Sequence, residues 1–321
     1  MDLNLAQVRA FLAIADRGHF GHAAASLSVT QQALSKRIAA LEDALGARLF
    51  DRGLHGVALT DAGHRFLEPA RRALAASDAA VAAVRDDVRP IRIDLWGHLY
   101  APGRTVSQAV ERMPDLAVEL GATRDLPTVV GGLVRGEIDT GFGRVHRTGL
   151  PGEETLTHRL VRLEPVDAVL AATHPLAGAA QLRPAELRDS VLWCPAAVDR
   201  LDFLRRFADQ FGVATESGVN LGIERFVDHI AAEPTRFSLF PADAPLPADP
   251  RIRSVPLVAP TPLYAWSLIW PDRTRHPRID ALLRGFLAVG RASRWLEYHP
   301  DRDWLPRHDR DELTTVEKVT R

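Results

Sequence analysis

The chain has 321 residues, of which 46% are hydrophobic and 25% are charged, and its formal net charge is −1 at pH 7. This composition indicates a folded protein of two or three domains with substantial hydrophobic cores. A single cysteine excludes an intramolecular disulfide framework, and the absence of any apolar run near about 18 residues excludes a membrane span, so we expect a cytoplasmic protein.

The first 29 residues predict two helices. Apolar side chains at Val8, Phe11 and Leu12 share one face of the first helix, which we expect to end at Gly18. Residues 21–27, "GHAAASL", predict a second helix whose three alanines permit close approach to its neighbours.

Residues 30–38, "TQQALSKRI", predict a third helix with an apolar face and a polar face. At about 100° per residue, Leu34 and Ile38 share one stripe, while Gln32 and Lys36 point the opposite way. Amides, hydroxyls and cations at the start of a helix are the groups that contact base edges and phosphates in a major groove. The candidate DNA contacts on this helix, with its N-cap, are Thr30, Gln31, Gln32, Ser35, Lys36 and Arg37.

Residues 49–59 predict a wing of two short strands, 49–51 and 57–59, around a turn at 53–56. Arg52 and His55 lie at its edge, where a cation can enter a minor groove or meet a phosphate. Residues 1–65 carry seven Lys/Arg and six Asp/Glu, so any positive surface must be local.

Thr60 is expected to cap a helix that runs to about Val88 and is kinked at Pro69. Its apolar residues recur at steps of three and four, which favours pairing with a second helix; packing on its own chain is the alternative. Pro90 marks a hinge.

From residue 91 onward, short apolar strands alternate with helices, which predicts a parallel α/β architecture. The expected strands are 91–96, 116–120, 138–144, 165–171, 191–194, 218–222, 236–241 and 263–270. The expected helices run from Gly97 to about 112, then over 126–135, 202–211, 224–232 and 279–293. No G-x-G-x-x-G turn or catalytic constellation is present, so we expect no enzyme activity and no cofactor.

The strings "AFLAIADRGHFGHAAASLSVTQQALSKRIAALEDALGARLFDRG" and "VALTDAG" resemble the N-terminal domain of the LysR-type transcriptional regulators. Three positions depart from the family pattern. Gly21 stands where a Ser or Thr cap is usual, Gln32 replaces a frequent proline, and Lys36 replaces a common arginine, which favours a phosphate contact over a bidentate contact to guanine.

The strings "RGEIDTGFGR" and "EPVDAVLAATHPLA" are similar to the family's effector domain, two Rossmann-like lobes of periplasmic-binding-protein type. The resemblance implies a winged helix-turn-helix at 1–60, a linker and dimerisation helix at 61–89, an effector-binding domain at 90–295 and a charged C-terminal tail at 296–321. Lobe I would cover about 91–163 and 268–293, and lobe II about 164–267.

The resemblance also implies partners. These are double-stranded DNA with an interrupted palindromic operator, a small-molecule effector, further copies of the chain in a homodimer or tetramer, and RNA polymerase as a candidate. A solute-binding receptor without a DNA-binding role is the alternative function; it would explain two lobes but leave residues 1–60 without use.

In such folds, ligands lie beyond the carboxyl ends of parallel strands, where helix N-termini offer free N–H groups to an anion. The candidate effector contacts at those ends are His98, Leu99, Tyr100, Arg144, Ala196 and Asn220. A structural histidine at His98 and a salt bridge across the hinge at Arg144 are the alternatives. "GFGR" is similar to the string in family members that control aromatic-compound catabolism, which suggests a small carboxylate effector.

The tail contains His299, Asp301, Asp303, His308 and Asp309. These residues lack a recognised metal-ligand spacing and stand among many charges, so we expect solvated side chains and no metal site. Trp295, Tyr298 and Trp304 are candidates for anchoring the tail on the effector domain, and Cys194 is expected to be a small buried residue.

Overall fold

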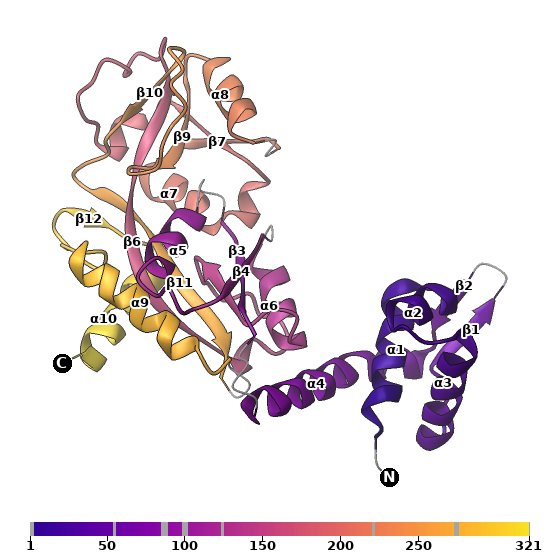
Figure 1. Cartoon of the computed structure of the whole chain (residues 1–321). Helices are drawn as coiled ribbons and strands as arrows, with labels where there is room; N and C mark the ends of the chain where they lie inside the picture. The colour runs from indigo at the N-terminus through magenta and orange to yellow at the C-terminus, as the bar shows by residue number, and fades with distance from the viewer. Residues whose placement is uncertain are drawn as a thin grey trace.

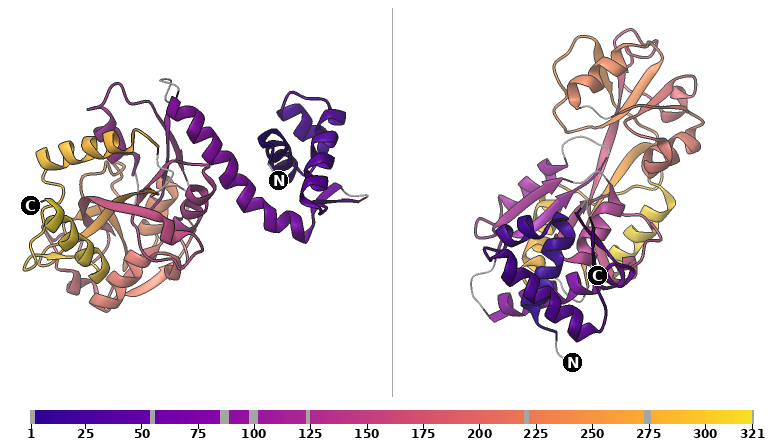
Figure 2. Two further views of the ribbon diagram at one scale, coloured as in Figure 1. Left: turned by 90° about the horizontal axis from the view of Figure 1, so that it is seen from below. Right: turned by 90° about the vertical axis from the view of Figure 1, so that its right-hand side faces the viewer.

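A computed structural model describes residues 3–53, 56–84, 89–97, 102–122, 125–219, 222–272 and 276–320. A small N-terminal helical unit is joined by one long helix to a larger α/β body (Figure 1). The long helix runs between the two parts in the left view of Figure 2.

The N-terminal unit contains the three predicted helices and the predicted hairpin. Its elements are α1 (Leu5–Arg17), α2 (Phe20–Ser26), α3 (Gln31–Leu45), β1 (Phe50–Gly53) and β2 (Gly56–Leu59). The apolar faces meet in one core that includes Phe11, Leu34 and Ile38. Gly18 ends α1 at a positive φ of 63°, a conformation that glycine adopts at little cost.

The start of α2 differs from the sequence expectation. The helix begins at Phe20 rather than Gly21, and the imidazole of His19 caps it by accepting a hydrogen bond from Gly21 N at 3.0 Å. The missing Ser or Thr cap is therefore replaced by a histidine acceptor two residues earlier.

Helix α4 (Asp61–Val84) is the linker. Thr60 Oγ1 accepts from Gly63 N at 3.0 Å, as expected of a cap, and the helix continues through Pro69. Phe66 and Leu74 pack on the N-terminal core, whereas Val81 is 49% exposed. The alternative of packing on its own chain thus holds for the first half of the helix, and pairing of the second half, which presents an apolar side chain to solvent, stays a prediction.

The body is built on one ten-stranded sheet. Its strands are β3 (Ile91–Leu95), β4 (Val118–Ala122), β5 (Thr140–Gly143), β6 (Leu156–Ala171), β7 (Val191–Cys194), β8 (Ala214–Ser217), β9 (Arg236–Pro241), β10 (Ile252–Val255), β11 (Thr261–Pro271) and β12 (Asp303–Trp304). The order along the main path is β4-β3-β5-β11-β6-β9-β7-β8, with β10 beside β6 and β12 beside β11. The helices are α5 (Gly103–Val110), α6 (Leu126–Arg135), α7 (Asp202–Phe211), α8 (Ile223–Ala231), α9 (Ile279–Ala292) and α10 (Arg307–Thr320).

Two long antiparallel strands, β6 and β11, run through the middle of the body (Figure 1). Lobe I, as used here, contains β3, β4, β5, α5, α6 and α9, and lobe II contains β7 to β10, α7 and α8. Strands within each lobe pair in parallel as expected (β4-β3-β5 and β9-β7-β8), but the central pairs β5-β11, β11-β6 and β6-β9 are antiparallel. The predicted α/β architecture is therefore confirmed, and the antiparallel pairs lie at its centre, where the chain crosses between lobes and returns.

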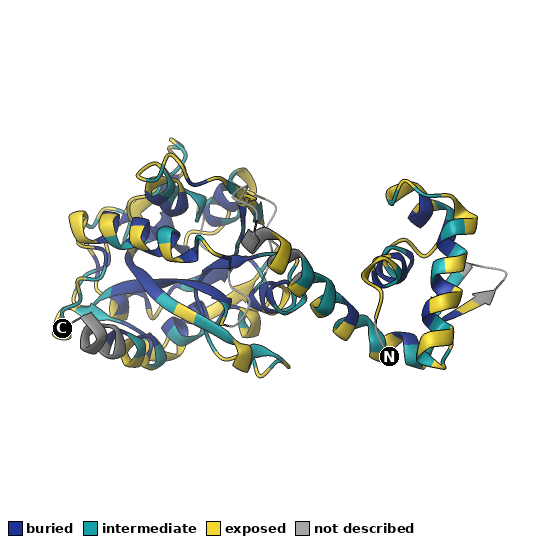
Figure 3. Cartoon of the chain, turned by 60° about the horizontal axis from the view of Figure 1, so that its bottom comes forward, coloured by how far each residue is buried: buried dark blue, intermediate teal, exposed yellow. Residues whose placement is uncertain are grey.

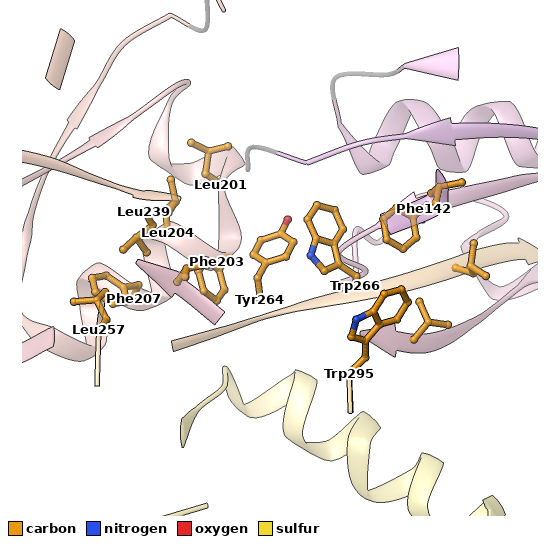
Figure 4. Close-up of a cluster of buried hydrophobic side chains, with 14 of the residues drawn as sticks. Phe142, Leu201, Phe203, Leu204, Phe207, Leu239, Leu257, Tyr264, Trp266 and Trp295 are labelled. Carbon is orange, nitrogen blue, oxygen red and sulfur yellow. The ribbon is translucent and has the colours of Figure 1, made fainter. Parts of the chain in front are cut away.

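Side chains of β11 alternate between the two faces of the sheet. Tyr264 and Trp266 join a core that also contains Phe203 of α7 and Phe142 of β5. Ring centroids are 4.9 Å apart for Phe203 and Tyr264, 4.6 Å for Tyr264 and Trp266, and 5.1 Å for Trp266 and Phe142. These rings form a continuous row from lobe II to lobe I (Figure 4), and the central strands are the most buried part of the body (Figure 3).

Two further boundaries differ from the sequence expectation. The strand expected at 218–222 lies at Ala214–Ser217, where all four residues are exposed and give no apolar pattern. Helix α5 begins at Gly103 rather than after Gly97.

Candidate DNA-binding and effector sites

Helix α3 presents a polar N-terminal half on the surface. Thr30 Oγ1 accepts a hydrogen bond from Ala33 N at 3.2 Å, which confirms the predicted N-cap. Gln31, Gln32 and Lys36 are exposed, while Ser35 and Arg37 are half-buried. Because the opposite face is fixed in the core by residues such as Leu34, the polar face is held outward by a rigid support.

The wing lies beside this helix as a two-stranded antiparallel hairpin in which Phe50 pairs with Leu59 and Gly53 with Gly56. Arg52 belongs to β1, and His55 falls outside the described residues. Both remain predicted DNA contacts.

Arg144 follows the end of β5 at the junction between the two lobes. Its side chain is 3% exposed; Nη1 donates to Asp202 Oδ2 of α7 at 2.7 Å and Nε donates to Asp309 Oδ2 of α10 at 3.0 Å. The second terminal nitrogen, Nη2, is buried and has no hydrogen-bond partner among the described residues. The salt bridge across the lobes, weighed above as the alternative for Arg144, is thus present, and contact with an effector remains a proposal.

The charges at this junction are strongly perturbed. Burial alone lowers the pKa of Arg144, but the carboxylates of Asp309 and Asp202 outweigh it and raise the value. Burial opposes ionisation of Asp202, yet hydrogen bonds and charges from Arg206 and Arg144 hold its pKa well below the usual range. Burial raises the pKa of Asp309 to about 6, although Arg144 opposes the shift. All three groups are therefore ionised at neutral pH.

A second ionic cluster joins the lobes on β6. Glu164 is 1% exposed and accepts from Trp266 Nε1 at 2.6 Å and from Arg104 Nη2 at 2.5 Å. Arg104 of α5 also donates to Asp243, which follows β9, at 2.6 Å. Arg162, 3% exposed, donates to Thr105 Oγ1 at 2.6 Å and to Asp243. Lobe I is thereby linked to lobe II through charged side chains.

Other predicted effector contacts are only partly described. His98, Leu99, Tyr100 and Asn220 lie outside the described residues. Ala196 follows β7 and is half-buried against the main core. Among the described residues, the side-chain contacts of Arg144 are with Asp202, Asp309 and the ring of Phe203, and Ala196 is not one of them.

Cys194 is fully buried, and burial raises the pKa of its thiol to about 12, as expected of a small core residue rather than a reactive thiol. Within the described part of the chain, no group of three or more His, Cys, Asp or Glu side chains is arranged to hold a metal ion. In the same part, no helix is long and apolar enough to cross a membrane.

Sequence reasoning missed Asp202, Asp309, Arg104 and Asp243 as members of the junction. Each is one charged residue among many, and each partner is distant in the chain: 165 residues separate Arg144 from Asp309, and 139 separate Arg104 from Asp243. No local pattern marks such pairs.

Two family models match the chain. Residues 5–64 match the bacterial regulatory helix-turn-helix protein of the lysR family, and residues 103–291 match the LysR substrate binding domain. The second match covers more than half of the chain.

The sequences of two known regulators match this chain over part of their length. The HTH-type transcriptional regulator YnfL of Escherichia coli (strain K12) is 36% identical over 196 residues, which is 58% of this chain and 64% of YnfL. YdcI of the same organism is 33% identical over 180 residues, which is 54% of this chain and 58% of YdcI. The chain thus spans about three fifths of the length of these relatives.

Solved structures share the whole architecture. A full-length OxyR variant from Pseudomonas aeruginosa superposes with a TM-score of 0.68 at 20% identity, covering 89% of this chain and 95% of that one. CbnR, described as a LysR family transcriptional regulator, has a TM-score of 0.61 at 23% identity, covering 91% and 99%. With both family matches in their usual order on one such fold, the chain belongs to the LysR family of bacterial regulatory helix-turn-helix proteins.

Proposed function

We propose that the chain is a DNA-binding transcriptional regulator whose contact with promoters is controlled by a small molecule bound between the lobes. The observation that carries the proposal is α3, whose polar N-terminal half is exposed opposite a buried apolar stripe. Further support comes from the CbnR structure solved with its target DNA, which has a TM-score of 0.61 at 24% identity. The relatives YnfL and YdcI are named as transcriptional regulators.

The partners follow from this function. The DNA would be an interrupted palindromic operator, read by two or more copies of the chain in a homodimer or tetramer paired through α4. RNA polymerase is a candidate partner at the promoter. Activity on chromosomal DNA places the protein in the cytoplasm.

The effector is proposed to be a small anion, with an aromatic carboxylate as the first class to test. The support is the concentration of guanidinium groups where the lobes meet: Arg144, Arg104 and Arg200 each bind a carboxylate of another element. An arginine can bind a carboxylate through two parallel hydrogen bonds. His98 and the other predicted contacts complete the proposed site.

The DNA-binding half of the proposal is tested by gel-shift titration of the full chain on the promoter regions beside its own gene, at two salt concentrations. Gln32→Ala is expected to lower operator affinity by about 1–3 kcal/mol with little change on random DNA, as for a residue that reads a base. Lys36→Ala is expected to weaken binding to both and to flatten the salt dependence.

Asp43→Ala is the matched control, because Asp43 is exposed on the C-terminal half of the same helix. Unchanged operator affinity in both the Gln32 and the Lys36 variants would remove α3 as the recognition element.

The effector half is tested by calorimetry of the full chain against a panel of aromatic and aliphatic acids. We expect one or more of these acids to bind, and we expect the heat of binding to disappear in Arg144→Ala and in His98→Ala. Arg112→Ala, an exposed arginine after α5, is the control. Acid binding that neither variant alters would place the effector elsewhere.

A further inference from the structure

The residues after α9, from 293 to 313, fold onto the body; we call them the C-terminal segment. They lie beyond the family match, which ends at residue 291. Strand β12 runs parallel to the start of β11, where Thr261 N donates to Arg302 O at 2.7 Å. Leu163 N of β6 donates to Trp295 O at 2.7 Å. The segment is thus hydrogen-bonded to both central strands.

The apolar side of the C-terminal segment covers the two central strands on the side of the body where β11 pairs with β5 of lobe I. Leu305 and Leu313 are 1% and 4% exposed and pack against Leu160, Leu163 and Leu263 of β6 and β11. This is the face of the sheet opposite the large core that α9 covers. Removing the segment would expose these leucines to water, so its docking is driven by apolar burial.

The same segment also packs on lobe II. The ring of Trp304 lies 5.7 Å from Phe203, 5.9 Å from Phe207 and 5.5 Å from Phe211, measured between ring centroids, and all three belong to α7. One short stretch of chain therefore contacts both lobes within ten residues.

Asp309 places a carboxylate at the junction between these contacts. It is 1% exposed and accepts from Arg144 Nε, while Arg144 Nη1 binds Asp202 at the start of α7. The guanidinium is thus shared between a carboxylate of lobe II and a carboxylate of the C-terminal segment. Because Nη2 of this buried arginine has no hydrogen-bond partner in the part of the chain that the structure describes, it has the capacity for one more acceptor.

We propose that Arg144 is a carboxylate-binding site whose ligand in this structure is the chain's own Asp309. The C-terminal segment is then a tethered ligand: it holds lobe I and lobe II in the present arrangement, and a small free carboxylate that replaces Asp309 releases it. A tethered group competes at a high effective concentration, so a free acid must make additional contacts in the junction to displace it. The proposal rests on the proposed function only for the consequence at DNA.

The first test is chemical rescue in the full chain, measured without DNA. Asp309→Ala removes the carboxylate and leaves room at Arg144, and formate or acetate at tens of millimolar is expected to raise the Tm of this variant by about 3 °C relative to chloride at equal ionic strength. Asp301→Ala, which changes an exposed aspartate of the same segment, and the unaltered chain are expected to show no carboxylate-specific gain.

The proposal is overturned if formate and chloride change the Tm of Asp309→Ala equally. It is also overturned if formate raises the Tm of the Asp301→Ala control by the same amount. If Asp309→Ala does not fold, Asp309→Asn carries the test, since it keeps the shape and loses only the charge. Amide hydrogen exchange in α7 and in residues 303–313 is then expected to be at least about tenfold faster than in Asp301→Asn. Exchange equal to that of the control overturns the proposal as well.

The consequence at DNA is measured separately. Asp309→Asn is expected to shift promoter binding in the same direction as a saturating acid effector does in the unaltered chain, and to reduce the further response to that acid. If formate rescues the Tm of Asp309→Ala but Asp309→Asn does not change promoter binding, the carboxylate site stands and its control of promoter binding does not. Unchanged operator affinity in the Gln32 and Lys36 variants bears on the proposed function alone.

Discussion

Asp139 fixes the end of the linker to lobe I. Its carboxylate, 7% exposed, binds the guanidinium of Arg89 through both oxygens and accepts from Arg92 N at 2.9 Å and Arg92 Nε at 3.2 Å. Burial opposes ionisation, but hydrogen bonds from these arginines hold the pKa of Asp139 at about 2. Arg89 stands directly before Pro90, so this residue joins the hinge to the sheet.

Asp139 therefore makes a contribution to stability that depends on pH. The folded pKa lies below that of an unfolded aspartate, about 3.9, so the carboxylate stabilises the fold by about 2 kcal/mol above pH 4. This contribution is lost as the pH falls from about 4 to about 2. Asp139→Asn is expected to lower the free energy of unfolding by about this amount at pH 7 and by much less near pH 2.5, measured by denaturant titration.

Asp115→Asn serves as the control, because Asp115 is exposed. If Asp139→Asn lowers the free energy of unfolding by the same amount at both pH values, the decrease comes from packing rather than from the ionised carboxylate.

At the scale of elements, helix α4 divides into two halves with different partners. Val81 is 49% exposed on the second half, while the first half packs on the N-terminal core. If copies of the chain pair through α4, Val81→Glu would bury a carboxylate between helices, which costs several kcal/mol or forces separation. Light scattering at micromolar concentration is expected to show a smaller species for this variant than for the unaltered chain.

Arg72→Gln is the matched control for Val81→Glu, because Arg72 is exposed and lies about 180° from Val81 around the same helix. A monomeric unaltered chain, or an oligomer that survives Val81→Glu, would argue against pairing through this part of α4. Leu74 is a poorer site for the test because it packs on its own N-terminal core.

The sequence predicts an element accurately where local residues mark its ends or its buried face. The bounds of α6 and α7 agree with the sequence because local signals set them: Asp125 caps α6, and Gly136 and Gly212 end the two helices at positive φ. Strand β8 was misplaced because all four of its residues are exposed, so no alternation marks it. Helix α3 combines both kinds of signal, a cap and an apolar stripe, and its position was predicted from the sequence.

The C-terminal segment shows what such patterns cannot supply. Trp295 and Trp304 do anchor it, as expected, but Asp309 is buried rather than solvated. Its environment is created by residues distant in the chain such as Arg144 and Tyr264, and the burial of a charge depends on the partner that three-dimensional folding provides.

At the scale of the whole molecule, one of the described contacts between the lobes is an ion pair on the surface. Arg200, 62% exposed, donates to Asp125 of lobe I at 2.5 Å. An exposed ion pair contributes less than about 1 kcal/mol, so Arg200→Ala is expected to leave the free energy of unfolding within that limit. The distribution of distances between one spin label on each lobe is nevertheless expected to broaden.

Arg253→Ala is the control, since Arg253 is exposed on β10 away from Asp125. Identical distance distributions in the two variants would mean that the pair has no part in setting the lobe arrangement. An effector that prefers one arrangement by about 1–3 kcal/mol, an ordinary coupling free energy, would then act through other described contacts between the lobes, such as those of Arg144 and Glu164.

Strand β6 passes through both lobes as the shared strand of a hydrogen-bonded ribbon. Its residues 156–165 pair with β11 at nine registered positions, with one irregularity at Trp266/Ser267, and its residues 166–171 pair with β9 and β10. A ribbon of this kind resists bending in its own plane but yields to twist, because twist changes every φ and ψ by only a little. Relative motion of the lobes should thus be a rotation about the ribbon axis rather than the opening of a jaw. What reaches α4 and the N-terminal unit from the lobes would then be torque. The irregularity at Trp266/Ser267, where Val161 of β6 has no registered partner on β11, is a place where the strands can twist more strongly, because a bulge increases the local twist.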